Sequence, residues 1–377
     1  MIKIGIECES IEEDVYGLAR IIQNFLERCA ARPELKLQFH FVLYFKRSIP
    51  DLPYLHDAMF TARLVRLPLQ PFTSFSLYYY ILLPLRMFFD HLDVMYFPNY
   101  MMPFGVFVPT ITHMTPDFYY EMMGDSLPMR YKMAYRIFGQ HALRHSSRLM
   151  VMSGASKEEM ARVIKIDPRR MFVNYLGISL QDITRYTLHV THPPYLLYVG
   201  QAFPRRHLRE TLLAFEKIAP EFPDLRFIIV GSDKYRPPIL DGLVKDINQR
   251  LRSDRVERKS HVSDEELHRL YMGAEAVTYI SDSEAFGLPP LEALAYGSVP
   301  VVADGPLSSE LFGVNAFFVS ETASPDSIAR TLKDALTDTQ RRSVIQKNAP
   351  YIVSEFTWDA HVDRFLSACQ SIVKHKS

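Results

Sequence analysis

The stretch that indicates the fold most directly is Ala276-Val277-Thr278-Tyr279-Ile280-Ser281-Asp282-Ser283-Glu284-Ala285-Phe286-Gly287-Leu288-Pro289-Pro290-Leu291-Glu292-Ala293. Its first five residues have small, β-branched and aromatic side chains, which predict a buried strand. The following turn contains Gly287 and two prolines. Proline is favoured in the first turn of a helix, so we expect Leu291–Tyr296 to be helical. A strand, a glycine-containing turn and a helix form the repeating unit of a parallel α/β sheet.

The same alternation continues on both sides of this stretch. The expected strands are Ile2–Ile6, Phe39–Phe45, Val94–Phe97, Pro109–His113, Leu149–Ser153, Tyr195–Gly200, Arg226–Gly231, Val299–Ala303 and Ala316–Val319. Amphipathic patterns predict helices at Gly17–Cys29, Met129–His145 and His207–Ile218. The alternation breaks near Gln181–Pro194, which ends in two prolines. We therefore predict an α/β protein with two doubly wound, Rossmann-like domains that face each other across a ligand-binding cleft.

The composition narrows the class of protein. The chain has 377 residues, with 43 Lys and Arg against 43 Asp and Glu, which disfavours duplex nucleic acid as a partner. Its three cysteines are an odd number and widely separated, so they give neither a metal-ligand spacing nor a disulfide framework. The N-terminus lacks a signal-peptide pattern, and the longest apolar run, Leu77–Leu85, is too short to span a bilayer. We expect a cytoplasmic protein.

Two carboxylates flank the turn between the expected strand and helix. Glu284 follows the strand, and Glu292 lies eight residues later, inside the helix. The helix start offers backbone N–H groups and the positive end of a dipole, which favour a phosphate. Each carboxylate can accept hydrogen bonds from a sugar diol. This layout fits a nucleotide sugar, whose pyrophosphate lies between two sugars. The alternative is structural: two solvated glutamates without a ligand.

Several segments together resemble the family 4 retaining glycosyltransferases, which have the GT-B fold. Glu284 and Glu292, with Phe286-Gly287-Leu288-Pro289 between them, resemble the carboxylate signature of that family. Further matching segments are Tyr198–Leu208, His261–Leu267, Gly297–Ala303 and Phe356–Trp358, and more loosely Gly17–Arg20, Val108–His113 and Val151–Ser153. The resemblance implies an acceptor-binding domain of residues 1–185 and a donor-binding domain of residues 194–357. A last helix, residues 358–377, would cross back to the first domain.

The resemblance also implies roles for single residues. As catalytic residues, Glu284 would contact hydroxyls of the donor sugar, His113 would lie over that sugar from the opposite domain, and Arg206 would stabilise the leaving diphosphate. Glu292 would hold the ribose diol. The other implied donor-binding positions are Gly17, Gln201, Arg205, Val262 and the backbone of Phe286, Gly287 and Leu288.

The implied reaction retains the configuration at the anomeric carbon and needs neither a metal nor a cofactor. No cluster of His, Asp or Glu has convincing metal-ligand spacing, so Arg205, Arg206 and the helix start would stabilise the leaving diphosphate in place of a metal. The sequence departs from the family pattern at Gln201, where some relatives carry Arg, in the acidic first loop Glu9–Gly17, and at three further positions. Met114 follows the histidine where Asp is common, Ala285 stands where Gly is usual, and Arg206 replaces a lysine.

Aromatic residues are concentrated in the first half of the chain. Of 47 aromatic residues, 15 lie between positions 72 and 120. A buried helix at Leu77–Phe89 with a core-facing loop at Met101–Phe107 is one explanation. A wall for a lipid-linked acceptor, or an interfacial contact, is the other. Residues 130–170 contain ten Lys and Arg against three Asp and Glu, which favours peripheral contact with an anionic membrane.

These patterns favour a glycosyltransferase that moves a hexose from a GDP- or UDP-linked sugar to a glycan or lipid-linked acceptor, in polysaccharide, lipopolysaccharide or glycolipid synthesis. Mannose is the favoured sugar, because the arrangement resembles mannosyl-transferring relatives. Two alternatives stay open. A same-fold sugar-nucleotide epimerase would act without an acceptor, and a non-catalytic scaffold would bind a nucleotide sugar without turnover. A phosphorylase would need a pyridoxal-phosphate lysine, for which the sequence has no motif.

Overall fold

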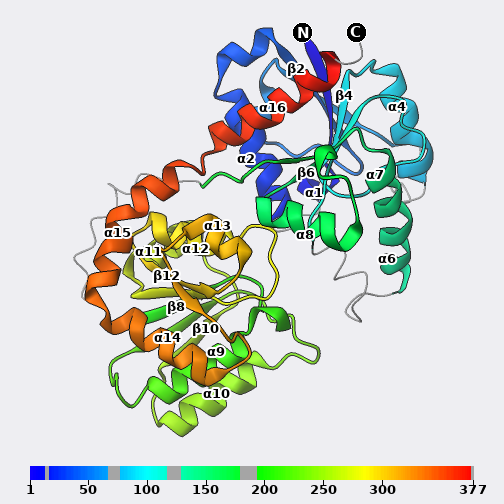
Figure 1. Ribbon diagram of the computed structural model, residues 1–377. Helices are drawn as coiled ribbons and strands as arrows, with labels where there is room; N and C mark the ends of the chain where they lie inside the picture. Colours follow the sequence, from blue (N-terminus) through cyan, green and yellow to red (C-terminus); the bar gives the residue numbers. More distant parts are fainter. Residues whose placement is uncertain (13–16, 67–76, 117–128, 179–192, 375–377) are drawn as a thin grey trace. The chain divides into compact units, whose positions relative to one another are not determined.

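The structure, a computed structural model, describes residues 1–12, 17–66, 77–116, 129–178 and 193–374 (Figure 1). The chain divides into two compact units. Residues 1–177 and 358–377 form the N-terminal unit, and residues 178–357 form the C-terminal unit. Each unit is built on one parallel sheet, which confirms the predicted α/β class with two Rossmann-like domains. Most of the predicted break at Gln181–Pro194 lies outside the described residues.

The sheet of the N-terminal unit has seven strands in the order β3-β2-β1-β4-β5-β6-β7. The strands are β1 Ile2–Glu7, β2 Phe39–Phe45, β3 Phe60–Leu64, β4 Val94–Phe97, β5 Thr110–His113, β6 Arg148–Val151 and β7 Met171–Val173. In the parallel register, Ile4 of β1 lies opposite Phe41 of β2 and Val94 of β4. The strand order therefore changes direction beside β1, which is the doubly wound arrangement that places ligands at the carboxyl ends of the strands.

Helices connect these strands, and the last helix of the chain, α16, joins the same unit. They are α1 Glu9–Glu12, α2 Leu18–Ala30, α4 Leu83–Phe89, α6 Met129–Ala134, α7 Gln140–His145, α8 Gly154–Ile164 and α16 Trp358–Lys374, with 3-10 turns η1 Pro33–Leu37, η2 Pro53–His56 and η5 Pro168–Arg170. Two segments, η3 Tyr78–Leu82 and η4 Tyr135–Gly139, are π-helical. The segment predicted as one helix at Met129–His145 is therefore α6, a π-helical turn and α7 in succession.

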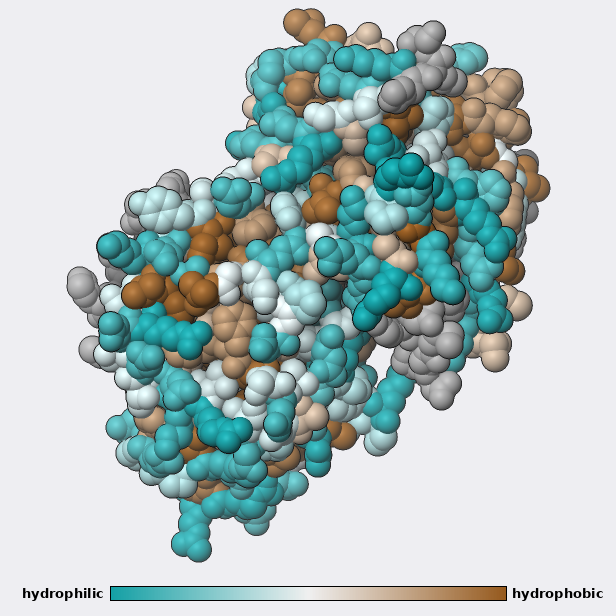
Figure 2. All heavy atoms as spheres, viewed as in Figure 1, coloured by the Kyte–Doolittle hydropathy of each residue, from teal (hydrophilic) through white to brown (hydrophobic). Residues whose placement is uncertain are grey.

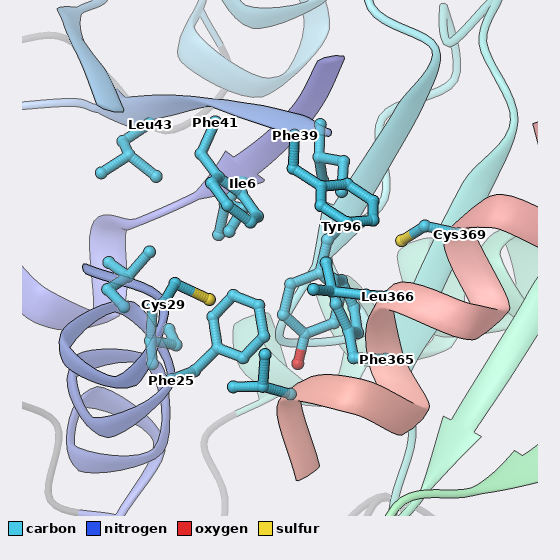
Figure 3. Close-up of a cluster of buried hydrophobic side chains, with 14 of the residues drawn as sticks. Ile6, Phe25, Cys29, Phe39, Phe41, Leu43, Tyr96, Phe365, Leu366 and Cys369 are labelled. Atoms are coloured by element: carbon cyan, nitrogen blue, oxygen red, sulfur yellow. The ribbon is translucent and has the colours of Figure 1, made fainter. Parts of the chain in front are cut away.

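The last helix of the chain, α16, packs into the N-terminal unit. Phe365 of α16 meets Phe25 of α2 edge to face, with ring centroids 5.0 Å apart, and lies 4.8 Å from the ring of Tyr96 on β4 (Figure 3). At the surface, Arg28 forms an ion pair with Asp359. These buried aromatic contacts join α16 to α2 and β4, and they hold the last helix against the N-terminal unit. The return of the last helix to the first unit agrees with the sequence prediction.

The sheet of the C-terminal unit has six strands in the order β10-β9-β8-β11-β12-β13. They are β8 Tyr195–Val199, β9 Arg226–Val230, β10 Val256–Lys259, β11 Ala276–Tyr279, β12 Val299–Ala303 and β13 Phe317–Val319. The helical elements are η7 Pro204–Arg206, α9 Leu208–Ile218, α10 Leu240–Leu251, α11 Asp264–Gly273, α12 Leu288–Ala295, α13 Pro306–Phe312, α14 Pro325–Thr337 and α15 Thr339–Ser354. The opening stretch of the sequence forms β11, a loop and α12, as predicted.

Three strands were absent from the sequence prediction, and all three lie at sheet edges: β3, β7 and β10. An edge strand is covered less completely than a central one, so its sequence needs fewer apolar residues. β10, for example, has the sequence Val256-Glu257-Arg258-Lys259, with only its first residue buried. No helix among the described residues combines the length and the apolar character needed to cross a membrane.

Candidate functional site

The carboxyl ends of β9, β8 and β11 are adjacent in the C-terminal sheet. Gly200 follows β8 with φ of +137°, and Gly231 follows β9 with φ of +144°, in the region that favours glycine. A Cβ atom on Gly231 would lie 1.9 Å from the carbonyl oxygen of Gly200. The two turns therefore pass each other this closely only because Gly231 carries no side chain. The chain then continues from Gly200 into η7, while the loop after β11 leads into α12.

These two turns are joined by an ion pair between Arg206 and Glu284. The Nε of Arg206 donates to Oε1 of Glu284 at 2.5 Å, and Nη2 donates to Oε2 at 2.9 Å, so the contact is bidentate. Nη1 of Arg206 also donates to the carbonyl oxygen of Gln201 at 2.8 Å. The Ser281 hydroxyl donates to Oε1 of Glu284 at 3.0 Å. The side chains of Arg206 and Glu284 are only 13% and 11% exposed, so this is a largely desolvated pair.

Aromatic rings flank the guanidinium of Arg206. Its central carbon lies 5.0 Å from the ring centroid of Tyr279, the last residue of β11, and 5.6 Å from that of Phe203. Such cation–π contacts are strongest where water is excluded. Burial works to lower the pKa of Arg206, but the neighbouring Tyr279 and Glu284 raise it by more. The residue therefore keeps its charge in a buried setting.

Arg205 has a different function in the local structure. Its Nε donates to the carbonyl oxygen of Ser283 at 3.2 Å, and its own carbonyl oxygen accepts the N–H of Asp282 at 3.0 Å. Its guanidinium also lies 4.6 Å from the ring centroid of Phe203. Arg205 thus holds η7 against the loop that carries Glu284, and this placement helps to fix the distance between the two turns.

Helix α12 starts just after Glu284. Gly287 precedes it in the left-handed conformation, with φ of 88° and ψ of 58°, and no side chain caps the first turn. Because Pro289 and Pro290 carry no N–H group, the backbone donors at this helix start are those of Gly287 and Leu288. These donors and the helix dipole favour an anion. The side chain of Phe286, by contrast, is buried against Phe356, with ring centroids 5.6 Å apart.

Glu292 lies in α12, about one turn beyond this helix start. Its Oε2 accepts a hydrogen bond from the hydroxyl of Tyr271 on α11 at 2.8 Å. Tyr271 is fully buried and shares a hydrophobic cluster with Val262, which precedes α11. The carboxylate of Glu292 is therefore oriented by a rigid partner while it stays half-buried. Val262 supports this arrangement through packing.

Two predicted site residues lie in the N-terminal unit. His113 ends β5 and is buried, with its Nδ1 donating to the carbonyl oxygen of Pro98 at 3.0 Å. Burial lowers the pKa of His113 to about 4, so the ring is neutral at pH 7. Its Nε2 is then an acceptor, and it has no hydrogen-bond partner within the described part of the chain. Gly17 precedes α2 with φ of +88°. Their contacts with a donor sugar stay predictions.

A buried cluster of charged side chains at the carboxyl end of β1 was missing from the sequence prediction. Glu7 is fully buried and accepts the backbone N–H of Glu9 at 2.7 Å. Lys46, which follows β2, forms an ion pair with Glu9, and the hydroxyl of Tyr79 donates to Oε2 of Glu9 at 2.7 Å. Glu12 accepts the backbone N–H of Lys46. The signal in the sequence is a run of acidic residues directly after a strand.

This cluster predicts a pH-dependent stability that Glu7→Gln removes. Burial, and next the Glu9 carboxylate, raise the pKa of Glu7 to about 8 from an ordinary 4.5. Between these values the folded state binds one proton more than the unfolded state, so stability falls as the pH rises. Between pH 6.5 and 8, above the ordinary pKa of histidine, the loss is about 2 kcal/mol, at 1.36 kcal/mol per pH unit. Glu7→Gln should abolish it.

The measurement is the thermal midpoint of the N-terminal unit at several pH values over this interval. Glu27→Gln is the matched control, since Glu27 is an exposed glutamate of the same unit, and this variant should keep the wild-type slope. If the slope of Glu7→Gln equals that of the wild type, the Glu7 carboxyl does not hold the extra proton.

The described residues contain no group of three or more His, Cys, Asp or Glu side chains placed to hold a metal ion. The absence of a metal requirement stays a prediction. Of the residues named from the sequence, the structure brings Arg206 into direct contact with Glu284 and Gln201. Arg205 contacts Ser283, the residue before Glu284. Tyr279 and Ser281, which contact Arg206 and Glu284, were not named from the sequence.

Comparison with known proteins shows what the chain is similar to. Residues 181–351, which lie in the C-terminal unit, match the family described as Glycosyl transferases group 1. The chain is 26% identical over 220 residues to O-antigen chain mannosyltransferase B of Escherichia coli, covering 56% of this chain and 57% of the relative. It is 25% identical over 189 residues to O-antigen chain mannosyltransferase RfbU of Salmonella typhimurium, covering 50% and 51%. The chain thus spans about half the length of these curated relatives.

Solved structures show the same fold over nearly the whole chain. The crystal structure of Anabaena Alr3699/HepE in complex with UDP-glucose matches with a TM-score of 0.71 at 17% identity, covering 98% of this chain and 100% of that one. WaaG, a glycosyltransferase involved in lipopolysaccharide biosynthesis, matches with a TM-score of 0.70 at 17% identity, covering 99% of each chain. These likenesses confirm the expected GT-B fold.

Proposed function

We propose that this protein is a glycosyltransferase that transfers a hexose from a nucleotide sugar to a glycan or lipid-linked acceptor. The observation that carries the proposal is the largely buried, charged Arg206, paired with Glu284 in the loop that leads into the start of α12, which no side chain caps. A fixed cation and a helix N-terminus at the carboxyl edge of a parallel sheet favour a diphosphate. The match of residues 181–351 to the group 1 glycosyl transferases supports the same reaction class.

In this proposal each polar group has one part of the donor to bind. Among the described residues, three of the five guanidinium N–H groups of Arg206 donate to Glu284 and Gln201. In the proposal, Arg206 would also donate to diphosphate oxygens. Glu284 would accept hydrogen bonds from the sugar hydroxyls. Glu292, held by Tyr271, would accept those of the ribose.

We also propose retention at the anomeric carbon without a metal. The bond between the anomeric carbon and the leaving phosphate oxygen breaks on one face of the sugar. The acceptor hydroxyl attacks on that same face and gives its proton to the phosphate oxygen. Arg206 and the α12 start would stabilise the negative charge that develops on the diphosphate. This chemistry belongs to the family 4 enzymes that the sequence resembles.

For the donor we favour GDP-mannose, and for the acceptor a lipid-linked glycan of lipopolysaccharide or polysaccharide synthesis, at the cytoplasmic face of a membrane. Two of the relatives are named O-antigen mannosyltransferases, which supports mannose. A third, at 26% identity over 213 residues, is named lipopolysaccharide 1,2-N-acetylglucosaminetransferase. UDP-linked sugars therefore belong in the same test.

The test is a transfer assay with GDP- and UDP-linked hexoses and a lipid-linked glycan acceptor, with and without EDTA. We expect transfer from one donor, a product with the anomeric configuration of the donor, and no loss of activity in EDTA. Turnover of the donor without an acceptor would indicate an epimerase instead. Nucleotide-dependent stabilisation without any turnover would indicate a scaffold.

Glu284→Gln should lower turnover in this assay at least tenfold, since the neutral amide has only one acceptor atom and cannot form the bidentate pair with Arg206. Glu321→Gln, an exposed glutamate of the same unit, is the matched control and should turn over like the wild type. If Glu284→Gln matches this control, Glu284 is not in the catalytic site.

A further inference from the structure

One surface of the N-terminal unit exposes large apolar side chains from two adjoining segments. We define the apolar patch as Tyr80, Ile81, Leu85, Phe88, Phe89, Phe104 and Phe107, all classed as exposed. In Figure 2, brown and tan atoms gather along the edge of the N-terminal unit that carries α4 in Figure 1. We propose that the apolar patch docks this unit onto the surface of a bilayer with anionic lipid headgroups. The inference deepens the proposed function, which has the acceptor at a membrane face. Vesicle binding is measured without turnover, so the two proposals can fail separately.

The helical part of the patch is a continuous stripe on η3 and α4. Ile81, Leu85, Phe88 and Phe89 are spaced by four, three and one residues, so they lie on one face of the helix. The opposite face carries Tyr79, Leu83 and Met87, which are buried in the core. The segment is therefore apolar on both sides. Burial in the unit explains the inner face and leaves the outer face without an explanation from folding.

The loop from Met101 to Val108 extends this stripe. The rings of Tyr80 and Phe104 are stacked, with centroids 6.0 Å apart. Gly105 packs closely on α4, since a Cβ atom there would lie 3.4 Å from the Cβ of Pro84. Phe107, beyond it, is 82% exposed. A groove of about 370 Å³ beside the patch is lined by Pro84, Met87, Phe88, His91, Leu92, Asp93, Gly105, Phe107 and Val108.

Basic side chains adjoin the patch. The ring of Phe104 lies 4.3 Å from that of His141 in α7, which places α7 and η4 next to the loop. The sequence from 129 to 156, which runs from α6 through η4, α7 and β6 to the start of α8, contains five Lys and Arg and no Asp or Glu. Of these, Arg136 and Arg144 are exposed.

An apolar surface with a one-sided positive border is complementary to an anionic membrane. The apolar side chains would enter the boundary between headgroups and acyl chains, and the arginines would meet the lipid phosphates. Met129, Met133 and Ile137, spaced by four residues along α6 and η4, are also exposed and lengthen the apolar surface. A protein partner would match the apolar patch equally well, but the absence of acidic residues over 28 positions favours an anionic partner of large area.

The experiment is flotation of the full chain with vesicles of phosphatidylcholine alone or with 30% phosphatidylglycerol, at low and high salt. We expect the wild type to float with the anionic vesicles at low salt. The triple variant Phe88→Ser, Phe89→Ser, Phe107→Ser should bind them at least tenfold more weakly. These side chains are exposed, so the variant should fold normally, which its thermal midpoint will check.

Tyr351→Ser is the matched control, because Tyr351 is 76% exposed but lies on α15 of the C-terminal unit. It should bind vesicles like the wild type. The proposal fails if the wild type stays unbound at low salt, or if the triple variant floats equally well. It also fails if the patch instead joins two copies of the chain, which sedimentation would show as a dimer that the triple variant cannot form.

Discussion

Replacing Arg206 by alanine is expected to lower kcat about 100- to 1,000-fold, the usual loss when one preorganised charge is removed from a transition state. The effect should be large because Arg206 is both buried and fixed. Glu284, the carbonyl of Gln201 and the ring of Tyr279 hold the guanidinium in one orientation. No reorganisation is then needed as charge develops on the leaving diphosphate. Steady-state kinetics with the donor found in the transfer assay will measure the loss.

Arg206→Lys separates charge from geometry. A lysine keeps the positive charge but lacks the planar two-nitrogen fork that pairs with both carboxylate oxygens of Glu284, so kcat should fall about tenfold rather than 100-fold. Arg209→Ala, an exposed arginine at the start of α9, serves as the control and should leave kcat unchanged. Should a folded Arg206→Ala variant retain wild-type kcat, the leaving group is stabilised by something other than Arg206.

The contact between Arg206 and Glu284 changes how the roles of these two residues, predicted from the sequence motifs, should be understood. The motifs place Arg206 on the diphosphate and Glu284 on the sugar, as separate contacts. In the structure the two side chains, 78 residues apart, form one unit. A donor that binds both would add ligand oxygens to a preformed pair. The loss of either partner should therefore affect both the phosphate and the sugar contacts, and the two variants should not be additive.

Periodicity predicted the central strands because they are buried on both faces and consist of continuous apolar runs. It missed β10, whose last three residues are charged, because an edge strand can satisfy its side chains in solvent. The π-helical turn at η4 was equally hidden, since an added residue in a helix turn leaves a short apolar pattern almost unchanged.

The sequence predicted those site residues that lie close together along the chain. Glu284, Gly287 and Glu292 lie within one strand–turn–helix unit, whose spacing is read directly from the sequence. The buried cluster of Glu7, Glu9 and Lys46 joins the ends of two strands, and these ends are 38 residues apart in the sequence. Its geometry depends on strand order, which periodicity does not specify. The same holds for Tyr279, whose aromatic character suits any buried strand until its contact with Arg206 is known.

Gly231→Ala is expected to destabilise the C-terminal unit by about 3–5 kcal/mol, which places it among the most severe single substitutions. Two effects combine at this position. The added Cβ would lie 1.9 Å from the carbonyl oxygen of Gly200, a backbone atom that cannot move without shifting β8. In addition, φ of +144° is a conformation that alanine strongly disfavours. Calorimetry should show the transition of this unit about 10 °C lower.

Gly242→Ala, in the same unit, is expected to have the opposite effect on stability. Gly242 lies in α10, is exposed, and has no described atom within 4 Å of the position of its Cβ. Alanine there should stabilise the unit by about 0.5–1 kcal/mol, because glycine is costly inside a helix. If the effect at Gly231 is steric, Gly231→Ala should lower the stability of the C-terminal unit while Gly242→Ala raises it. If Gly231→Ala shifts the transition by less than 2 °C, the close passage of the β8 and β9 turns is not a constraint on this fold.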